Sequence, residues 1–241
     1  MTDKPTSDVF EIMHTCRAMR RLKPDPVPED VLVRLVDAAI HAPSSSNAQN
    51  WRFVIVRDRA QKQRIAELWQ AGAAWYQETI GAAPPRPGED PEQRKRSQAA
   101  LQYMLDHIAD VPAIVFLAVK KDEVIAKAVA SPNTITAAFR HLGLGGTVRL
   151  LRGAGNATAT GIYATAYPAA QNLLLAARAL GLGAVLTTPQ LFHPGQYEKL
   201  LGLPSDVTLA AVIPVGYPLG KFGPVKRPDP RSMISWDRYS A

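Results

Sequence analysis

Small polar side chains are concentrated in one short segment, APSSSNAQNW, which spans residues 42–51 and which we call the serine turn. A helix-like apolar pattern precedes it, and the strand-like sequence FVIVRD follows it. A helix stop needs few capping groups, so these hydroxyls and amides exceed what the turn itself requires. Together with free backbone N–H groups they can bind the edge of a planar heterocycle that carries carbonyl oxygens and ring nitrogens. The polar residues are Ser44, Ser45, Ser46, Asn47, Gln49 and Asn50.

Basic side chains gather near both ends of the chain. Arg17, Arg20 and Arg21 lie in the sequence RAMRRL, and Lys226 and Arg227 lie in the C-terminal tail. A guanidinium group binds phosphate through a bidentate fork of N–H donors, so these residues are candidates for a phosphate site. The spacing of Arg17 and Arg20 places both on one side of a predicted helix end. A solvated basic helix end explains that spacing equally well.

The sequence patterns supply no evident reactive group. Five histidines show no metal-ligand spacing, no G-x-S-x-G elbow is present, and the single cysteine excludes a disulfide framework and a cysteine-based zinc cluster. That cysteine, Cys16, is either a packing residue or a thiol whose pKa the adjacent Arg17 lowers. The glycine pattern of a dinucleotide site fails twice, because Val148 and Leu186 occupy its last position. An enzyme without reactive side chains of its own uses a cofactor for the chemistry, and the protein binds and orients that cofactor and provides the electrostatic environment.

Composition and charge narrow the class of protein. The chain has 241 residues, of which 46% are hydrophobic and 20% charged, and its formal net charge is +7. This charge favours a phosphate-bearing ligand over nucleic acid, because the basic residues form short clusters rather than a long tract. The N-terminal sequence lacks a signal-peptide pattern, and no apolar run reaches the length of a membrane helix. We therefore expect a cytoplasmic protein with no membrane partner.

The residue pattern predicts a single α+β domain over residues 1–241, with helices packed on a sheet. The run VPAIVFLAV is apolar throughout, which predicts a strand buried on both faces. Residues 140–160 are rich in glycine and poorly periodic, so we expect a loop or mobile segment there, and residues 218–241 predict an extended arm. Helices are expected near residues 8–19, 28–40, 61–74, 93–109 and 167–180, and strands near 51–57, 111–119, 184–188 and 209–217.

Four segments occur in an order that is typical of one protein family. They are RAMRRL followed by PDPV, then APSSSNAQNW, the helix-like YPAAQNLLLAA, and PVGYP followed by KRP. Together they resemble the nitroreductase superfamily of FMN flavoproteins over most of the chain, with residues 70–105 and 140–160 as variable insertions. Ala18 stands where the family usually has serine, and Asn50 where proline is common. Loss of the serine hydroxyl weakens phosphate binding by about 1 kcal/mol, the net value of one hydrogen bond.

The resemblance implies a fold, a homodimer and a cofactor. The expected fold is a central, mostly antiparallel sheet flanked by helices, with the C-terminal arm exchanged in the dimer and two FMN sites at its interface. Basic residues would hold the FMN phosphate, the serine turn would reach the flavin ring from the partner subunit, and residues 186–188 would lie by its reactive edge. The implied FMN-binding residues are Arg17, Ala18, Arg20, Arg21, Pro43, Ser44, Ser45, Ser46, Asn47, Gln49, Leu186, Thr187, Thr188, Lys226 and Arg227.

The resemblance also implies an activity. The expected enzyme is an FMN-dependent NAD(P)H oxidoreductase that takes hydride from NADH or NADPH and reduces a small aromatic acceptor, such as a nitro compound or quinone, with ping-pong kinetics. The alternatives are a reductive dehalogenase or another specialised reaction of the superfamily, and a flavin-binding protein without turnover. The insertions would form the substrate walls, where Trp69, Trp75, Tyr76 and Tyr103 either stack on a substrate or pack in the core. No catalytic side chain, metal or nucleic-acid partner is expected.

Overall fold

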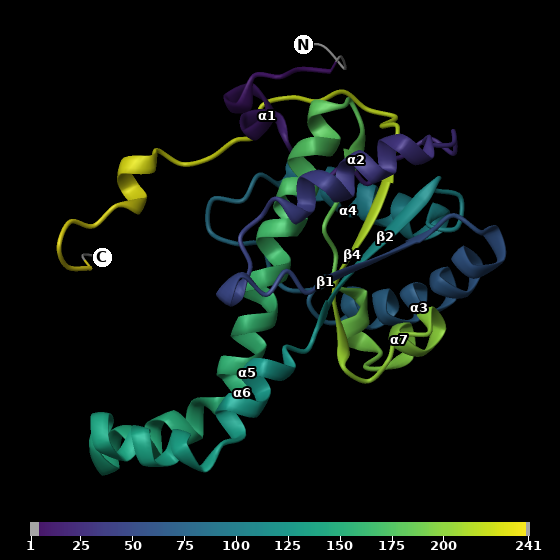
Figure 1. The fold of residues 1–241 in the computed structure, drawn as a ribbon. Coiled ribbons are helices and arrows are strands. Elements are labelled where there is room, and N and C mark those ends of the chain that lie inside the picture. The colour runs from purple at the N-terminus through teal and green to yellow at the C-terminus, as the bar shows by residue number, and fades with distance from the viewer. Residues whose placement is uncertain (1–4, 240–241) are drawn as a thin grey trace.

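Four strands form one antiparallel sheet in the order β1-β2-β4-β3 (Figure 1). The computed structural model describes residues 5–239, apart from the side chains of residues 130 and 154–158. At one end of the sheet, Trp51 pairs with Val119 and Val119 pairs with Thr208, and at the other end Ala113 pairs with Val215. The strands are β1 (Trp51–Val56), β2 (Ala113–Lys120), β3 (Gly183–Ala184) and β4 (Val207–Gly216).

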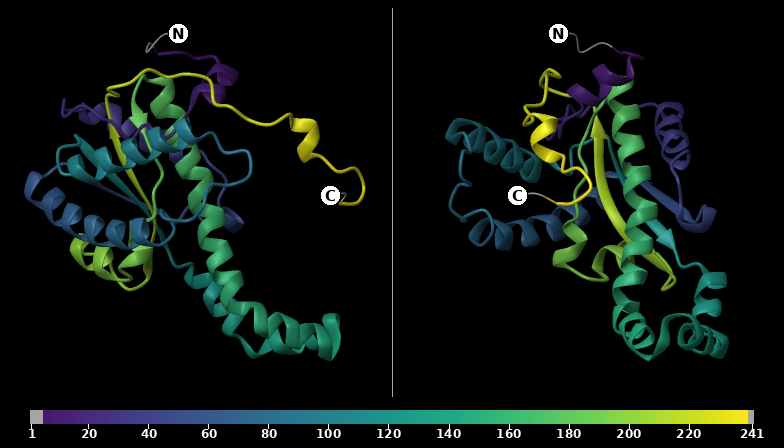
Figure 2. Two further views of the ribbon diagram at one scale, coloured as in Figure 1. Left: turned by 180° about the vertical axis from the view of Figure 1, so that it is seen from behind. Right: turned by 90° about the vertical axis from the view of Figure 1, so that its left-hand side faces the viewer.

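Helices cover both faces of the sheet (Figure 2). One face packs against α2 (Glu29–Ile40) and α6 (Pro132–Ala179), and the other packs against α3 (Arg59–Glu78), α4 (Pro91–His107) and α7 (Gln196–Leu201). This arrangement confirms the predicted α+β fold with a central antiparallel sheet. The chain also contains α1 (Val9–Thr15), α5 (Glu123–Ala130) and the 3-10 turns η1 (Ser45–Asn47), η2 (Pro189–Phe192) and η3 (Pro230–Met233).

The strand β2 is buried on both faces, as its uninterrupted apolar sequence predicts. Val115 and Leu117 belong to the core on the side of α2 and α6, whereas Ile114 and Phe116 belong to the core on the side of α3 and α4. All four side chains are at most 1% exposed. Successive side chains of a strand point to opposite faces, so each apolar residue of β2 contributes to one of the two cores.

The first helix is shorter than predicted, which corrects the interpretation of two arginines. The pattern predicts a helix over residues 8–19, whereas α1 ends at Thr15 and Cys16 has the extended angles φ −66° and ψ 116°. Arg17 and Arg20 therefore lie in non-helical backbone, and the prediction that both occupy one side of a helix end is wrong.

Backbone pairing with distant segments explains why that helix stops. The Met19 N–H donates to the carbonyl of Ala184 at 3.1 Å, and Leu22 forms a β-bridge with Pro218. Helix propensity is a weak local preference, and such tertiary hydrogen bonds override it. The segment is thereby fixed beside β3 and the C-terminal end of β4.

The predicted loop at residues 140–160 is wrong, because this stretch belongs to α6. The Ser131 side chain caps the helix by accepting from the Asn133 N–H, and Gly143 interrupts its interior with φ 64° and ψ −178°. Each glycine costs about 1 kcal/mol relative to alanine, but extending an existing helix is much easier than starting one. The N-terminal half of α6 and α5 project together from the body (Figure 1). Among the described residues, no helix is both long and apolar enough to cross a membrane.

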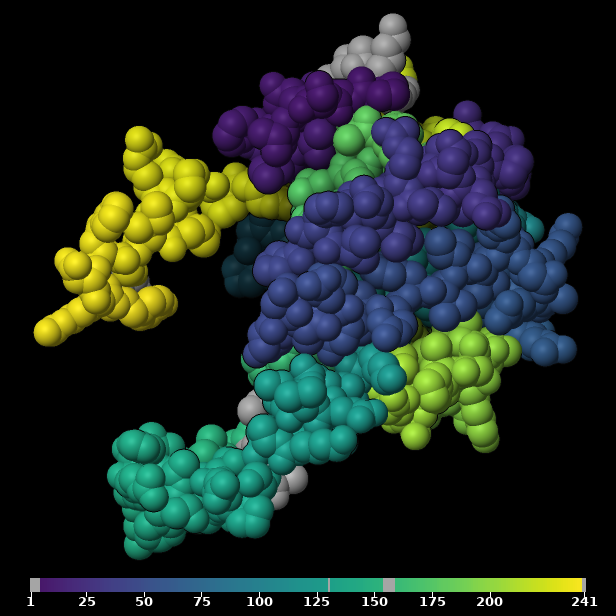
Figure 3. Space-filling view, in the orientation of Figure 1, coloured from purple at the N-terminus to yellow at the C-terminus, as the bar shows by residue number. Residues whose placement is uncertain are grey.

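The C-terminal tail runs along the body and then leaves it as an extended arm (Figures 1 and 3). Its large apolar side chains are exposed, with Trp236 at 82% and Tyr239 at 89%. The described part of the tail matches the arm predicted for residues 218–241, of which 240–241 lie outside the described residues. Exchange of this arm with a partner stays a prediction.

Candidate functional site

The serine turn has an unusual backbone. Ser46, Asn47 and Gln49 have positive φ angles of 52°, 53° and 48°. Few residues other than glycine adopt this left-handed conformation, and each instance costs on the order of 1–3 kcal/mol. Such strain persists only where surrounding contacts impose it, and it concentrates at ligand-binding sites. The backbone therefore supports a functional role for this turn beyond ending α2.

Thr165 of α6 holds the inner side of the serine turn. Its hydroxyl accepts from the Ser45 N–H at 3.1 Å, and its carbonyl accepts from the indole N–H of Trp51 at 3.0 Å. Thr165 is only 1% exposed, whereas the side chains of Ser45 and Asn47 are exposed. The turn thus presents its polar side chains outward from a fixed base. Thr165 is not distinguishable in the sequence from any other helical threonine.

We expect Thr165→Val to lower the free energy of unfolding by about 1–3 kcal/mol, because it leaves the Ser45 N–H without its acceptor. Urea denaturation monitored by circular dichroism measures the change. Thr208→Val is the matched control, because it is the same substitution at an exposed position on β4. Equal stability of the two variants would mean that the Thr165 hydroxyl does not hold the turn.

The basic residues of the two chain ends converge because the two ends pair with each other. The end of α1 and the segment after it run antiparallel to the segment after β4. Backbone hydrogen bonds of 3.0 Å lead from the Leu219 N–H to the Arg21 carbonyl and from the Val225 N–H to the His14 carbonyl. This pairing brings the C-terminal cations to the end of the molecule that carries the N-terminal ones. We call this set the basic cluster, and its members are Arg17, Arg20, Arg21, Lys226 and Arg227.

Among the described residues, the cations of the basic cluster lack counter-ions. In the part of the chain that the structure describes, none of the five forms an ion pair with an acidic side chain. Arg20 is half-buried, so desolvation lowers its pKa, while Tyr76 of α3 acts in the opposite direction. Arg21 stacks 5.4 Å above the ring of Tyr103. Uncompensated like charges repel one another, so the cluster favours an anionic ligand.

The serine turn and the basic cluster lie at opposite corners of the sheet. The turn leads into β1 at one edge, whereas the segment after α1 lies beside β3 and the C-terminal end of β4. The length of β2 separates the two ends by about 20 Å, at about 3.3 Å per residue. The helix α6 gives the same separation. It contacts the serine turn at Thr165 and α1 at Arg178, and a helical rise of about 1.5 Å per residue places these two residues about 20 Å apart. The backbones of the two groups in one chain are therefore about 20 Å apart, a separation that favours a site assembled from two chains.

The predicted flavin-edge residues 186–188 follow β3, at the same edge of the sheet as the basic cluster. Thr187 forms a β-bridge with Val212, in which its N–H donates to the Val212 carbonyl at 3.0 Å and its hydroxyl donates to the same oxygen at 2.6 Å. That hydroxyl is therefore engaged within the chain. Leu186 and Thr188 are half-buried, and Thr188 leads into η2.

The aromatic residues suggested for substrate stacking divide into two groups. Trp69 is 5% exposed and belongs to the core, so its role is packing. Trp75 is 54% exposed, and its ring lies 5.5 Å from that of Phe192, which also contacts Tyr76 at 6.4 Å. The partner ring comes from η2, and nothing in the sequence connects this residue with α3.

Cys16 is a protected thiol and not an activated one. Its Sγ donates to the Leu174 carbonyl at 3.7 Å, burial raises the pKa of the thiol, and Arg178 lowers it to a smaller extent. We expect iodoacetamide to alkylate Cys16 about tenfold more slowly than free cysteine, because less thiolate is present and access is limited. Mass spectrometry over time measures the rate. Alkylation as fast as that of free cysteine would show that burial does not protect the thiol.

The comparison with known proteins identifies the family. A family model described as the nitroreductase family matches residues 15–217. The chain belongs to the nitroreductase family. It is 32% identical over 228 residues to an NADH dehydrogenase of Thermus thermophilus, a match that covers 91% of each protein.

Solved structures share the fold of this nitroreductase-family protein. An iodotyrosine deiodinase bound to FMN and 3-iodo-L-tyrosine matches with a TM-score of 0.64 and 21% identity, covering 96% of this chain and 100% of the other. A nitroreductase with bound FMN from Desulfitobacterium hafniense DCB-2 matches with a TM-score of 0.59 and 16% identity, covering 99% and 100%. The predicted family and fold are confirmed.

Proposed function

We propose that this protein is an FMN-dependent NAD(P)H oxidoreductase that works as a homodimer. The observation that carries the proposal is the division of the site, with uncompensated cations at one corner of the sheet and a strained polar turn at the opposite corner. Two subunits related by a twofold axis can bring these corners together twice. When bound, FMN would supply the chemistry by accepting hydride from NADH or NADPH and passing it to an acceptor.

The residues present fit FMN. The basic cluster suits its phosphate, and the exposed side chains of the serine turn suit the polar edge of its ring. Asn50, near the end of the turn, donates to the Lys120 carbonyl at 2.6 Å, while its buried Oδ1 has no hydrogen-bond partner among the described residues. The members of this cradle are Arg17, Ala18, Arg20, Arg21, Lys226 and Arg227 for the phosphate, Pro43, Ser44, Ser45, Ser46, Asn47 and Gln49 for the ring, and Leu186, Thr187 and Thr188 for its reactive edge.

Three exposed surfaces support the dimer. A hollow of about 510 Å³ lies on α6, where the rings of Tyr163 and Tyr167 stack 5.1 Å apart. The projecting α5–α6 segment exposes Leu144 at 65%, and the C-terminal arm exposes Trp236 at 82% (Figure 3). Apolar surface on this scale marks an interaction site, and a second copy of the chain covers it in the proposed dimer.

The acceptor is proposed to be a small aromatic molecule, a nitro compound or a quinone. The exposed ring of Trp75, packed against Phe192, offers a planar surface next to Tyr76, whose side chain acts electrostatically on Arg20. A second candidate is reductive dehalogenation, which the likeness to a deiodinase bound to 3-iodo-L-tyrosine favours. Halogenated phenols therefore belong among the acceptors to be tested.

The visible spectrum of the purified protein under argon tests the proposal. We expect a flavin spectrum that bleaches when NADH or NADPH is added and returns when a nitroaromatic, quinone or halogenated phenol follows. Flavin that neither nicotinamide bleaches would favour a flavin-binding protein without turnover. A colourless protein that also fails to take up added FMN would contradict the proposal.

A further inference from the structure

We infer that the buried Arg178 positions the phosphate-binding residues of the FMN site, because it ties the two segments that carry them to the end of α6. The inference rests on the proposed function, since it assigns a role within the same cradle. Arg178 lies in the last turn of α6, and 2% of its side chain is exposed. A positive charge there is favourable to the helix dipole, but a buried guanidinium also needs partners.

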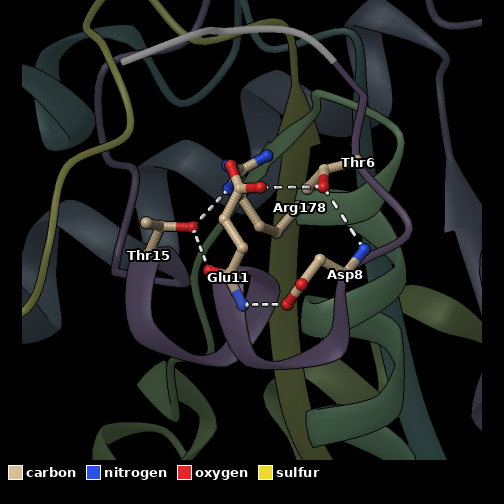
Figure 4. A network of polar contacts seen from close by, with 5 residues as sticks. All are labelled: Thr6, Asp8, Glu11, Thr15 and Arg178. Carbon is tan, nitrogen blue, oxygen red and sulfur yellow. Dashed lines mark hydrogen bonds and ion pairs between the residues drawn. The ribbon is translucent and has the colours of Figure 1, made fainter.

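The guanidinium of Arg178 contacts two chain segments at once, and Figure 4 shows its contacts with the first of them, α1. On one side, its Nε donates to the Thr15 hydroxyl at 2.8 Å and its Nη2 to Glu11 Oε1 at 3.2 Å, both in α1. On the other side, its guanidinium carbon lies 4.3 Å above the ring of Phe222, which belongs to the segment after β4. We call this arrangement the arginine clasp, made of Arg178, Glu11, Thr15 and Phe222.

Further hydrogen bonds close the clasp into a network. The Thr15 hydroxyl donates to the Glu11 carbonyl at 2.6 Å, and the Thr6 hydroxyl donates to Glu11 Oε2 at 2.9 Å (Figure 4). The Thr6 N–H donates to the carbonyl of Ala179, the residue after the arginine. Both carboxylate oxygens of Glu11 are thus occupied, and the N-terminal segment is fixed to the end of α6.

Each segment held by the clasp leads directly to the basic cluster. Thr15 precedes Arg17 by two residues, and Phe222 precedes Lys226 by four. The two segments also bond to each other next to the clasp, with the Val225 N–H donating to the carbonyl of His14, the residue before Thr15, at 3.0 Å. One side chain therefore fixes the backbone on both sides of the cluster.

The clasp serves binding because the cations of the cluster repel one another when no anion is present. Because the clasp holds the backbone in place before the phosphate binds, less conformational entropy is lost on binding. Apolar residues often replace both members of a buried ion pair without loss of stability, whereas removal of one member alone is destabilising. The role of Arg178 in binding is therefore tested by ligand affinity and not by stability. A lysine cannot reproduce the clasp, since it lacks the planar fork that reaches two acceptors and stacks on a ring.

The test compares FMN with riboflavin, which has the same ring but no phosphate. We expect Arg178→Met to weaken FMN binding about tenfold to a hundredfold and riboflavin binding less than about threefold, in fluorescence titrations of the apoprotein. Arg178→Lys should resemble Arg178→Met. The matched control is Arg34→Met, because Arg34 is exposed on α2 and far from the clasp in sequence. Hydrogen exchange of the apoprotein should show faster exchange at residues 16–23 and 219–225 in both Arg178 variants.

The outcomes separate the inference from the proposed function. A wild-type protein that does not bind FMN contradicts the proposed function and the inference together. If the wild type binds FMN, two results overturn the inference alone. One is an unchanged ratio of FMN to riboflavin affinity in Arg178→Met, and the other is unchanged amide exchange in the Arg178 variants. If Arg178→Met does not fold, Thr15→Val decides, because it removes one acceptor of the clasp and must shift the same ratio and the same amides. Normal FMN binding by Arg178→Lys would show that charge is sufficient and would overturn the clasp.

Discussion

Mixing two variants with impaired sites, Arg20→Ala and Ser45→Phe, is expected to restore about a quarter of the wild-type activity. Arg20→Ala removes a phosphate-binding cation, and Ser45→Phe places a bulky ring where the serine turn meets the flavin. If the cradle combines the basic cluster of one chain with the serine turn of its partner, a mixed dimer has one site with both defects and one site with none. Random assortment makes about half of the dimers mixed, and each recovers about half of its sites.

The measurement uses chains with two different affinity tags, so that mixed dimers are purified after co-expression and their activity is compared with that of each parent. The purified mixed dimers, with one intact site of two, should have about half of the wild-type activity. Arg20→Ala combined with Lys226→Ala is the matched control. These residues belong to the same half of the cradle, so both sites of that mixed dimer carry one defect and stay impaired. Restored activity in the control, or none in the Arg20→Ala and Ser45→Phe dimer, would contradict a site divided between chains.

Arg20→Ala is also expected to weaken FMN binding about 10-fold to 150-fold, which corresponds to the roughly 1.5–3 kcal/mol of a hydrogen bond to a charged group. Arg20 is the half-buried member of the basic cluster, whereas Arg17, Arg21, Lys226 and Arg227 are exposed and screened by water. Arg20→Lys should fall between the wild type and Arg20→Ala, because it retains the charge but loses the bidentate fork.

Titration of the apoprotein with FMN and riboflavin measures this effect. Arg21→Ala is the matched comparison, because the neighbouring side chain is exposed and stacks on Tyr103, and we expect its loss to reduce FMN affinity less than tenfold. Riboflavin affinity should change little in both variants. An Arg20→Ala variant that binds FMN as tightly as the wild type would remove Arg20 from the phosphate site.

The sequence predicts the sheet well because its strands have strong local signals. The apolar run before Lys120 identifies β2, and the alternation of its side chains between two cores follows from strand geometry. The serine turn is also visible in the sequence, since Ser44 to Asn50 contain more hydroxyls and amides than a helix stop uses. Its left-handed backbone is not visible, because these residues adopt that conformation only under contacts such as the bond from Ser45 to Thr165.

The features that the sequence does not predict depend on contacts between distant residues. The helix expected to reach residue 19 ends at Thr15 because Met19 pairs with Ala184, which lies far along the chain. The glycine-rich stretch 140–160 is helical because it extends α6, although its composition favours a loop. The same limit applies to Arg178, whose partners in α1 and after β4 come together only in the folded chain.

The separation of the serine turn from the basic cluster likewise follows from the fold and not from the residue pattern. The sequence identifies the serine turn and the basic residues as candidates, but it gives no distance between them. The register of β1, β2 and β4 places the two groups at opposite corners of the sheet. The expectation that the turn serves the partner's flavin, which came from the family resemblance, thereby gains an independent geometric reason.

Native mass spectrometry of the FMN-loaded protein tests the central claim most directly. A cradle shared between two chains predicts a species with two chains and two FMN molecules, and no single chain that carries FMN. Dilution that dissociates the dimer should release both cofactors. A single chain that retains one FMN would show that both halves of the site come from the same subunit and would contradict the account.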